Sequence, residues 1–382
     1  MRLFSVSEGF DMPILIILLL IMVIGLVALF SSSHVYALYQ YDDSFYIIRR
    51  QLIFTVAGIV IMLLVSMIDY HILHRFAFVL MAISIALLVI VLFMEPIAFV
   101  NRWIKIPVLG QFQPSEIAKF SLIVLFSHLI SMKENTMKKF LSGYLPFMLI
   151  LGLTCALVII EPHLSGTLLM LGIGISMMFV GGTRLIYILS TVLLGSGAVG
   201  TMIFVLGYER ERINVWLKPF EMYAGTTTER NAAWQTVQSL YAIGSGGLMG
   251  LGLGNSVQKH LFLPEGHNDF IFAVFCEEMG FIGAAVVIIL FALLVWRGIS
   301  ISTRAADKFG SMLAFGLTIQ IGIQAFLNIA VVTNTMPNTG ISLPFFSYGG
   351  TSLIMLLAQM GVVLSVSRSV NRDQDKRLAK HA

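Results

Sequence analysis

The sequence has little charge and almost no cysteine. Asp, Glu, Lys and Arg make up 12% of its 382 residues, about half the share of roughly 25% found in soluble domains. This shortage argues against a soluble protein, and the modest net charge of +4 gives no indication of nucleic-acid binding. The two cysteines, Cys155 and Cys276, lie inside separate apolar runs. Their positions fit core packing and exclude a disulfide framework or a thiolate metal site.

What the sequence has in abundance is apolar side chains, which make up 58% of it. A helix that crosses a bilayer needs about 20 such residues. We therefore expect an all-α, polytopic membrane protein with about ten transmembrane helices, near residues 13–32, 52–69, 74–94, 115–131, 143–160, 165–181, 185–207, 270–296, 309–332 and 350–367. The first run leads into residues 31–33 without a cleavage pattern, so it is expected to be a signal anchor.

The distribution of Lys and Arg predicts how these helices are oriented. If the N-terminus is cytoplasmic, the short inner loops and the tail 368–382 carry most of the basic residues. By the positive-inside rule, both termini are then cytoplasmic. We expect one transmembrane domain over residues 1–382, with a large extracellular loop at 208–269 and a basic cytoplasmic tail at 368–382. No internal repeat is evident, which argues against transporters built from inverted repeats.

The densest group of titratable residues ends at Asp269, directly before the apolar run that begins at Phe270. One interpretation is structural, because a carboxylate at a helix N-terminus can cap the free N–H groups. The other is catalytic. His260, Glu265 and His267 lie close by in sequence, and a carboxylate beside a dry helix bundle can have its pKa raised to a value suited to a general base.

A second group opens the predicted fourth span, where Pro114 suits a first helical turn. Glu116 and Lys119 are three residues apart, so they share one face of this helix. They form either an ion pair at the membrane interface or an acid and a cation directed at a phosphorylated headgroup.

The predicted outer loops also carry cations, which the positive-inside rule makes unexpected. They are Arg50, Arg102, Lys105, Arg210, Arg212 and Lys218. Because arginine can hold phosphate through two parallel hydrogen bonds, their partner is either a pyrophosphate-bearing lipid or an ordinary phospholipid headgroup.

A glycine turn precedes the last predicted span, in the stretch Ser347-Tyr348-Gly349-Gly350. Such a turn before a helix leaves backbone N–H groups that suit an anion. A simple helix start explains the same residues equally well.

Polar residues also lie inside two predicted spans. Glu277 and Glu278 follow the start of one by about two turns. Gln320, Gln324 and Asn328 form a stripe at intervals of four residues on the next. Because polar groups in lipid need partners, the two helices are expected to pack together. These residues have either a structural role or a role in an ion path, as in a transporter.

Taken together, these motifs resemble the SEDS family (shape, elongation, division and sporulation). The similarity runs in order from Arg49-Arg50-Gln51 through Arg102-Trp103 and the stretches 113–119, 235–247, 263–272 and 344–350. It covers nearly the whole chain, with the expected ten spans. Within the family, residues 254–259 are more similar to the division and sporulation branch (FtsW, SpoVE) than to the elongation branch (RodA).

The resemblance implies a peptidoglycan glycosyltransferase that polymerises lipid II at the outer face of a bacterial plasma membrane. It also implies a class B penicillin-binding protein with transpeptidase activity as partner, together with other membrane proteins of the division or elongation machinery. Two alternatives are a flippase for lipid II and a non-catalytic division scaffold.

Under this hypothesis Asp269 is the general base for the acceptor hydroxyl. The residues expected to bind substrate are Arg50, Arg102, Glu116, Lys119, Arg212, Lys259, His267, Ser347, Gly349 and Gly350. Glu116 is also the candidate ligand for a divalent cation, Mg²⁺ or Mn²⁺, whose preference for oxygen suits it. No organic cofactor is expected.

Two departures from the family's pattern bear on this hypothesis. Where the family usually has a carboxylate after the proline that follows the fifth span, this chain reads Glu161-Pro162-His163. Glu161 keeps an acid nearby, but no role is carried over for the acid that is absent. The family's Gly-rich approach to Arg102-Trp103 is replaced by residues 98–101, which contain no glycine.

Overall fold

Each apolar run predicted to cross the membrane forms a helix in the structure, a computed structural model that describes residues 9–94, 102–106, 110–204, 207 and 210–381. The long helices are α1 (Met12–Tyr41), α2 (Tyr46–Met67), α3 (His71–Leu92), α4 (Pro114–Met132), α5 (Leu145–Ile160), α6 (Leu164–Val180), α7 (Leu185–Phe204), α11 (Ile271–Arg304), α12 (Lys308–Val332) and α13 (Gly350–His381). Among the described residues, eight helices are long and apolar enough to cross a membrane, and α6 and the part Leu185–Gly197 of α7 are shorter apolar helices. The prediction of an all-α, polytopic membrane protein is confirmed.

Strands are confined, in the described ranges, to one short hairpin before α4. Its strands are β1 (Ile104–Ile106) and β2 (Gly110–Phe112), which pair antiparallel with Ile104 opposite Phe112. The departure from the family pattern at residues 98–101 lies outside the described residues.

Local sequence explains where two of the helices begin. The side chain of Asp11 caps α1 by accepting a hydrogen bond of 3.2 Å from the Ile14 N–H, and Asp307 caps α12 by accepting one of 2.9 Å from the Gly310 N–H. Each cap satisfies an N–H group that the helix itself leaves without a partner. Asp11 also forms an ion pair of 2.8 Å with Arg297 near the end of α11, which joins α1 to α11.

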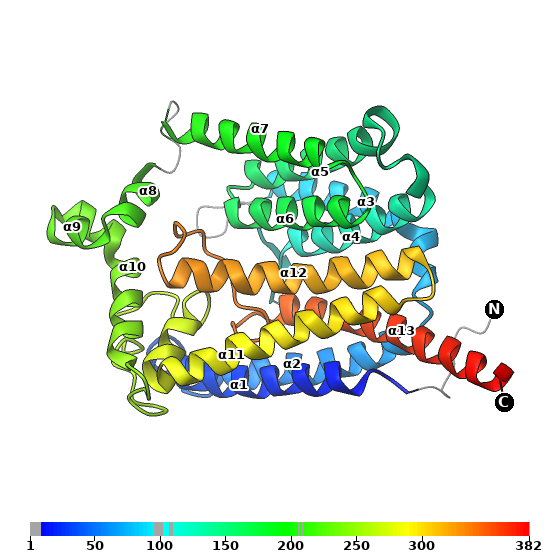
Figure 1. Ribbon diagram of the computed structural model, residues 1–382. Helices are drawn as coiled ribbons and strands as arrows, with labels where there is room; N and C mark the ends of the chain where they lie inside the picture. Colours follow the sequence, from blue (N-terminus) through cyan, green and yellow to red (C-terminus); the bar gives the residue numbers. More distant parts are fainter. Residues whose placement is uncertain (1–8, 95–101, 107–109, 205–206, 208–209, 382) are drawn as a thin grey trace.

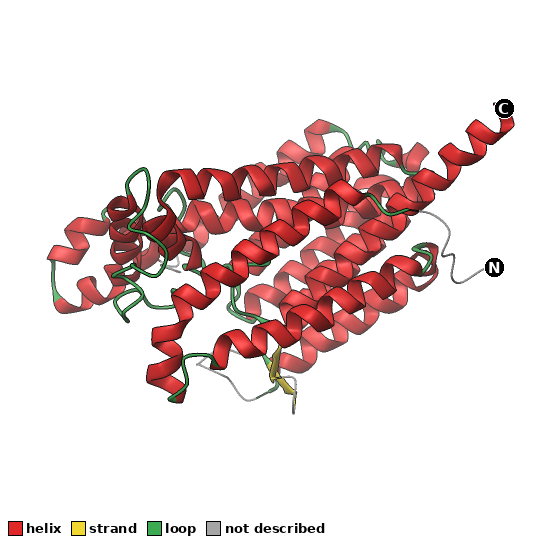
Figure 2. Cartoon of the chain, turned by 90° about the horizontal axis from the view of Figure 1, so that it is seen from below, coloured by secondary structure: helices red, strands yellow, loops and turns green. Residues whose placement is uncertain are grey.

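The helices run roughly along one axis, and the start of α1 and the end of α13 lie at the same end of the bundle (Figure 1, and from below in Figure 2). This arrangement agrees with the prediction that both termini lie on one side of the membrane. The opposite end is called the outer end below, following the predicted orientation. Helices α4, α12 and α13 occupy the centre, since 78%, 67% and 78% of their most apolar stretches are buried, against 28% for α2 and α3.

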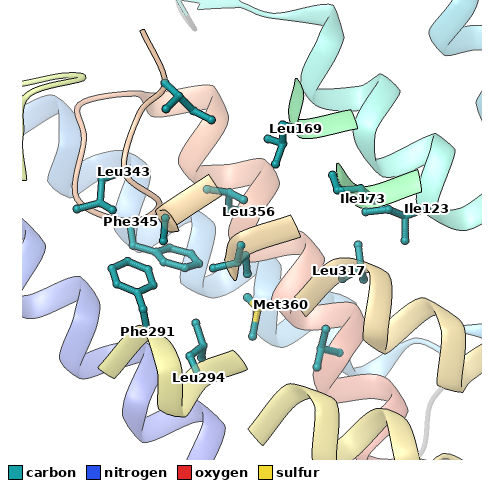
Figure 3. Close-up of a cluster of buried hydrophobic side chains, with 14 of the residues drawn as sticks. Ile123, Leu169, Ile173, Phe291, Leu294, Leu317, Leu343, Phe345, Leu356 and Met360 are labelled. Atoms are coloured by element: carbon teal, nitrogen blue, oxygen red, sulfur yellow. The ribbon is translucent and has the colours of Figure 1, made fainter. Parts of the chain in front are cut away.

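The core lies where these central helices meet α6, α11 and the segment before α13 (Figure 3). Large apolar side chains from all six parts of the chain contact one another there: Ile123, Leu169, Ile173, Phe291, Leu294, Leu317, Leu343, Phe345, Leu356 and Met360. Because segment 343–345 is anchored in this core, the residues on either side of it are held at a fixed position along the axis of the bundle.

The stretch 208–269, expected to be a large loop, contains three helices within its described part. These are α8 (Arg210–Leu217), α9 (Pro219–Ala224) and α10 (Thr227–Gly246), and α10 lies across the outer end of the bundle (Figure 1). Helix α10 begins with a capping box in which Thr226 and Glu229 bond to each other's backbone N–H groups. The described part of this stretch is therefore a folded cover that consists largely of helices.

Helix α11 is interrupted at Gly280, whose backbone has φ 65° and ψ −169°. The segment 247–252 fills the interruption. Its amides donate to the carbonyls of Glu277 and Glu278 at 2.9 Å, and the Phe281 N–H donates to the Gly247 carbonyl at 2.9 Å. The outer part of α11 is thus tied to the stretch that follows α10.

We predict that Gly280→Ala destabilises the protein. A Cβ atom at this position would lie 2.3 Å from the Gly250 nitrogen, and the positive φ disfavours any L side chain. Overpacking and backbone strain of this kind each cost about 1–3 kcal/mol. Thermal unfolding in detergent, followed by tryptophan fluorescence, should show a clear fall in Tm.

The control for this prediction is Gly152→Ala in α5. A Cβ atom there would meet no heavy atom within 4 Å, and alanine favours a helix over glycine by about 1 kcal/mol. Its Tm should stay level or rise. Equal melting temperatures for Gly280→Ala and the unmodified protein would contradict the account of α11.

Candidate functional site

The outer end of the bundle encloses a cavity of about 670 Å³. Its wall is formed where α2, α4, α6 and α13 begin, where α12 ends, and by the segments directly before α11 and α13. Eight of the residues that the sequence assigned to a site line it: Asp269, Arg50, Arg102, Glu116, Lys119, Ser347, Gly349 and Gly350. Motifs that are far apart in the chain therefore face one space.

Asp269 lies two residues before α11 and does not cap it. The residue at the N-cap is Phe270, and no side chain accepts a capping hydrogen bond, so the capping interpretation of Asp269 is wrong. The Asp269 carbonyl accepts a hydrogen bond of 2.7 Å from Asn328, whose amide nitrogen also donates to the Ile341 carbonyl at 2.6 Å. The carboxylate itself faces Gly340, where a Cβ atom would lie 3.2 Å from Oδ2.

Burial raises the pKa of Asp269 to about 6, and the nearby charge of Glu265 adds to the rise, while Arg102 opposes it. A carboxylate in this range is ionised at neutral pH and is a stronger base than an exposed one. The site therefore contains a group suited to accept a proton from a hydroxyl near neutral pH.

The segment before α13 is fixed by two side chains. Gln51 of α2 donates to the Ser347 carbonyl and accepts from the Gly349 N–H, both at 3.3 Å. The Ser347 hydroxyl donates to the Asn268 carbonyl at 2.7 Å and accepts from the Leu343 N–H at 2.8 Å. The Ser347 hydroxyl thus holds the backbone next to Asp269, and the segment presents the backbone near Gly349 and Gly350 to the cavity.

The cations of the cavity differ in how they are held. Lys119 forms an ion pair of 2.7 Å with Glu116, and both side chains are almost fully buried. The Arg50 guanidinium bonds the Tyr46 hydroxyl at 3.0 Å and lies 5.6 Å from the centre of that ring. Arg102 acts electrostatically on Asp269. Together these three residues make the cavity suitable for an anionic group.

Three of the assigned residues do not line the cavity. Lys259 forms an ion pair of 2.9 Å with Glu278, with 1% and 2% of the two side chains exposed. His267 is stacked on Tyr36 at 4.4 Å between ring centres. Arg212 donates to the Asn338 carbonyl at 3.3 Å. In the structure these three side chains support the outer segments and do not face the cavity.

The polar residues inside the two predicted spans make only part of the contacts that were expected. Helices α11 and α12 do pack together, but Glu278 bonds Ser31 of α1 and Lys259 rather than the stripe on α12. Two residues of the stripe instead serve the cavity. Gln324 lines it and donates to the Ser342 carbonyl at 3.1 Å, and Asn328 holds the backbone of Asp269.

Sequence reasoning left His163 and Glu161 without a role. The first lines the cavity, and the second is a buried neighbour in sequence on which Arg102 of the cavity acts. Burial together with the charges of Arg102 and Lys119 lowers the pKa of His163 to about 3. Burial raises the pKa of Glu161 to about 8, opposed by Arg102. At neutral pH the histidine is therefore uncharged and most of the Glu161 carboxyl is protonated. The signal in the sequence was the departure from the family pattern at these positions.

The described residues offer few ligands for a metal ion. No group of three or more His, Cys, Asp or Glu side chains converges among them. Glu116 lines the cavity, and its Oε2 atom has no hydrogen-bond partner within the described ranges. Mg²⁺ often uses one or two carboxylates and completes its shell with substrate phosphates and water, so Glu116 fits as a single protein ligand.

The chain is similar to known proteins over nearly its whole length. The family model for FtsW, RodA and SpoVE, described as "Cell cycle protein", matches residues 11–372. A probable peptidoglycan glycosyltransferase FtsW of Geobacter sp. (strain M18) is 39% identical over 94% of this chain and 97% of its own length. Stage V sporulation protein E of Bacillus subtilis (strain 168) is 40% identical over the same shares.

Solved structures share the fold. A chain from a structure described as "Structural coordination of polymerization and crosslinking by a peptidoglycan synthase complex" matches with a TM-score of 0.76 and 25% identity, over 96% of this chain and 99% of that one. The rod shape determining protein RodA of Thermus thermophilus matches with a TM-score of 0.69 and 25% identity, over 94% and 97%.

We predict that Lys259 contributes to stability rather than to substrate binding. Lys259→Met leaves Glu278 as an unpaired buried carboxylate, which costs about 3–5 kcal/mol. The variant should therefore melt at a lower temperature, whereas Lys259→Met combined with Glu278→Leu should recover most of the loss. A variant Lys259→Met with an unchanged Tm and a raised KM would return Lys259 to the substrate site.

Proposed function

The chain belongs to the family of FtsW, RodA and SpoVE cell-cycle proteins, and on this premise we propose that its outer cavity polymerises lipid II with Asp269 as the general base. The overall activity follows from the relatives: the protein is a peptidoglycan glycosyltransferase of cell division and a multi-pass protein of a bacterial membrane. What the cavity adds is a division of roles among its residues.

One observation carries the proposal: a carboxylate with a raised pKa and three cations face the same cavity at the outer end of the bundle. Lipid II joins a disaccharide to a polyprenyl chain through a diphosphate. Chain growth forms a bond between a sugar hydroxyl of the acceptor and the anomeric carbon of the donor, and it breaks the bond from that carbon to the diphosphate. Such a displacement inverts the anomeric centre and needs a base on one side and positive charge on the other.

The named residues supply both requirements. Asp269 accepts the proton of the attacking hydroxyl, and its backbone is fixed by Asn328 at 2.7 Å. Arg50, Arg102 and Lys119 stabilise the charge of the departing diphosphate, since all three line the cavity. The polyprenyl chains are bound by the apolar surfaces between the helices, and the residues that line the cavity include Leu169, Leu353 and Leu356.

A divalent cation, Mg²⁺ or Mn²⁺, fits this arrangement as a partner of the diphosphate. Glu116 would hold it through the oxygen that has no hydrogen-bond partner among the described residues. When bound, such an ion neutralises negative charge on the leaving group. Lys119, at 2.7 Å from the other oxygen, holds the Glu116 carboxylate in place.

The partner that best fits the protein is a class B penicillin-binding protein with transpeptidase activity. The structural relative with a TM-score of 0.76 is part of a peptidoglycan synthase complex that coordinates polymerization and crosslinking. The folded cover formed by α8, α9 and α10 is available for contact on the outer side, where the cross-linking of new strands takes place. Other membrane proteins of the division machinery are expected to assemble with the pair.

The alternative of a lipid II flippase rested on Glu277 and Glu278 and on the polar stripe of α12. Glu277 and Glu278 suggested an ion path, but their carboxylates accept hydrogen bonds from Ser256, Ser31 and Lys259. These contacts tie α1, α11 and the segment after α10 together, which is a structural role.

We predict that Asp269→Asn reduces polymerisation by about 10²–10⁴-fold, the usual contribution of a general base. Purified protein with its penicillin-binding partner would be incubated with labelled lipid II in detergent, and the glycan products separated by size. The side-chain volume and the backbone bonds are kept, so the Tm should change little. Glu221→Gln, which alters an exposed carboxylate on α9, is the matched control and should polymerise normally.

Two results would contradict the assignment. Asp269→Asn with the rate of the unmodified protein would show that another group takes the proton. An unmodified protein that makes no glycan in detergent, where sidedness is absent, would instead favour the flippase or the scaffold.

The pH dependence provides a separate prediction. Because the pKa of Asp269 is raised to about 6, the base is ionised above this pH and protonated below it. The value of kcat/KM should therefore be level above about pH 7 and fall about tenfold for each pH unit well below 6. Glu265→Gln removes a negative charge that raises this pKa, so it should move the inflection to lower pH. A profile that stays flat from pH 5 to 8 would rule out Asp269 as the base.

A further inference from the structure

His163 lines the cavity, yet the proposed mechanism gives it no role. It stands at the turn between α5 and α6, where this sequence departs from the family's acidic residue. Its backbone is fixed on both sides: the His163 N–H donates to the Val158 carbonyl at 3.2 Å, and the His163 carbonyl accepts from the Thr167 N–H at 3.1 Å. The imidazole thus enters the cavity from a rigid support.

The ring has little freedom to turn. A Cβ atom at Gly166 would lie 2.6 Å from the imidazole Cε1 and Nδ1 atoms, so the glycine leaves just enough room for the ring. The Nδ1 atom also faces the amide nitrogen of Gln113 at 3.2 Å and the Ser115 hydroxyl at 3.5 Å. The two neighbours from the start of α4 therefore fix the ring's orientation.

These contacts define which ring nitrogen carries the proton. The Gln113 amide nitrogen is a donor, so Nδ1 accepts and the neutral ring carries its proton on Nε2. The ring is neutral because burial and the cations Arg102 and Lys119 lower its pKa to about 3. The Nε2 atom makes no hydrogen bond within the described ranges. It is also not one of the polar atoms there that are buried without a hydrogen-bond partner. It is therefore a donor that faces the cavity.

The surroundings indicate what this donor would bind. Arg102 and Lys119 are the two charged groups that act on the His163 ring, and all three residues line the same cavity. An anion bound there by these cations therefore shares the cavity with the His163 ring. A neutral donor adds a directed hydrogen bond to such an anion without repelling the cations. An ionised carboxylate at the same position would instead repel the anion.

We propose that His163 binds an oxygen of the substrate's diphosphate through Nε2–H, and that Gln113 is the positioning residue that fixes this tautomer. The proposal rests on the proposed function, because it assumes that Arg50, Arg102 and Lys119 bind the diphosphate in the same cavity. It makes position 163 a determinant of how this chain holds its leaving group.

A binding experiment tests the proposal without catalysis. Farnesyl diphosphate serves as the probe and farnesol as the uncharged reference, with binding to the purified full chain measured by titration calorimetry at pH 7. His163→Leu removes the donor, His163→Gln places an amide donor near the position of Nε2, and His163→Asp introduces a negative charge. His71→Leu, at the opposite end of the bundle, is the control.

We expect His163→Leu to weaken farnesyl diphosphate binding by about tenfold or more, as for the loss of one hydrogen bond to a charged group. His163→Gln should stay within about threefold of the unmodified protein, and His163→Asp should bind more weakly than His163→Leu. Gln113→Leu should weaken binding less than His163→Leu. Farnesol binding and the His71→Leu control should not change.

The pH dependence of the effect of His163→Leu on binding distinguishes a neutral imidazole donor from a charged imidazole. The ratio of the Kd values of His163→Leu and the unmodified protein should be constant from pH 6 to 8. A ratio that grows as the pH falls through 6.5 would mean that a charged imidazole binds the anion, and it would overturn the proposal. Equal affinity of His163→Leu and His163→Asp with the unmodified protein would overturn it as well.

Two further results keep the interpretation unambiguous. If His163→Leu does not fold, as judged by its Tm, the comparison of His163→Gln with His163→Asp still decides between the outcomes. Asp269→Asn should bind farnesyl diphosphate at least as tightly as the unmodified protein while losing polymerisation, so a failure of the catalytic assignment is distinct from a failure at His163. An unmodified protein that does not prefer farnesyl diphosphate to farnesol would refute the diphosphate site itself.

Discussion

The amide group of Asn328 is the constraint on which the site depends. Its single nitrogen donates to the carbonyls of Asp269 at 2.7 Å and Ile341 at 2.6 Å, and the side chain is fully buried. Either carbonyl left without a partner in this dry setting would cost about 1–3 kcal/mol. The two backbone segments before α11 and before α13, which both line the cavity, are thus held together by the end of α12, a helix that is otherwise packed in the core.

A second support acts from the other direction. The outer part of α11, which follows Asp269, ends at the interruption at Gly280. The buried pair of Lys259 and Glu278, together with the backbone bonds of segment 247–252, fixes this part against α1 and the end of α10. The carboxylate of Asp269 is therefore held through its backbone on both sides, while its oxygens are free to exchange a proton because they cap no helix.

The sequence predicted the spans well, because the thickness of a bilayer forces apolar runs of a length that few other structures require. It also predicted the cavity residues that lie at helix starts, such as Glu116 and Lys119. It failed for Lys259, whose partner is 19 residues further along the chain. Whether a polar residue of segment 247–269 faces the cavity depends on the interruption of α11, and a left-handed φ at Gly280 cannot be distinguished by sequence from a glycine in a regular helix.

The charges of the cavity are coupled through Arg102, which limits the pKa of Asp269 and also lowers that of His163. A diphosphate bound beside Arg102 neutralises this charge, so the pKa of Asp269 rises when the donor is in place, and the carboxylate becomes a better base at the moment it is needed. A charged imidazole at position 163 would reverse part of this gain, because its positive charge would lower the pKa of Asp269 again. A neutral imidazole at position 163 avoids that loss, since it can hold the diphosphate by a hydrogen bond while leaving the basicity of Asp269 intact.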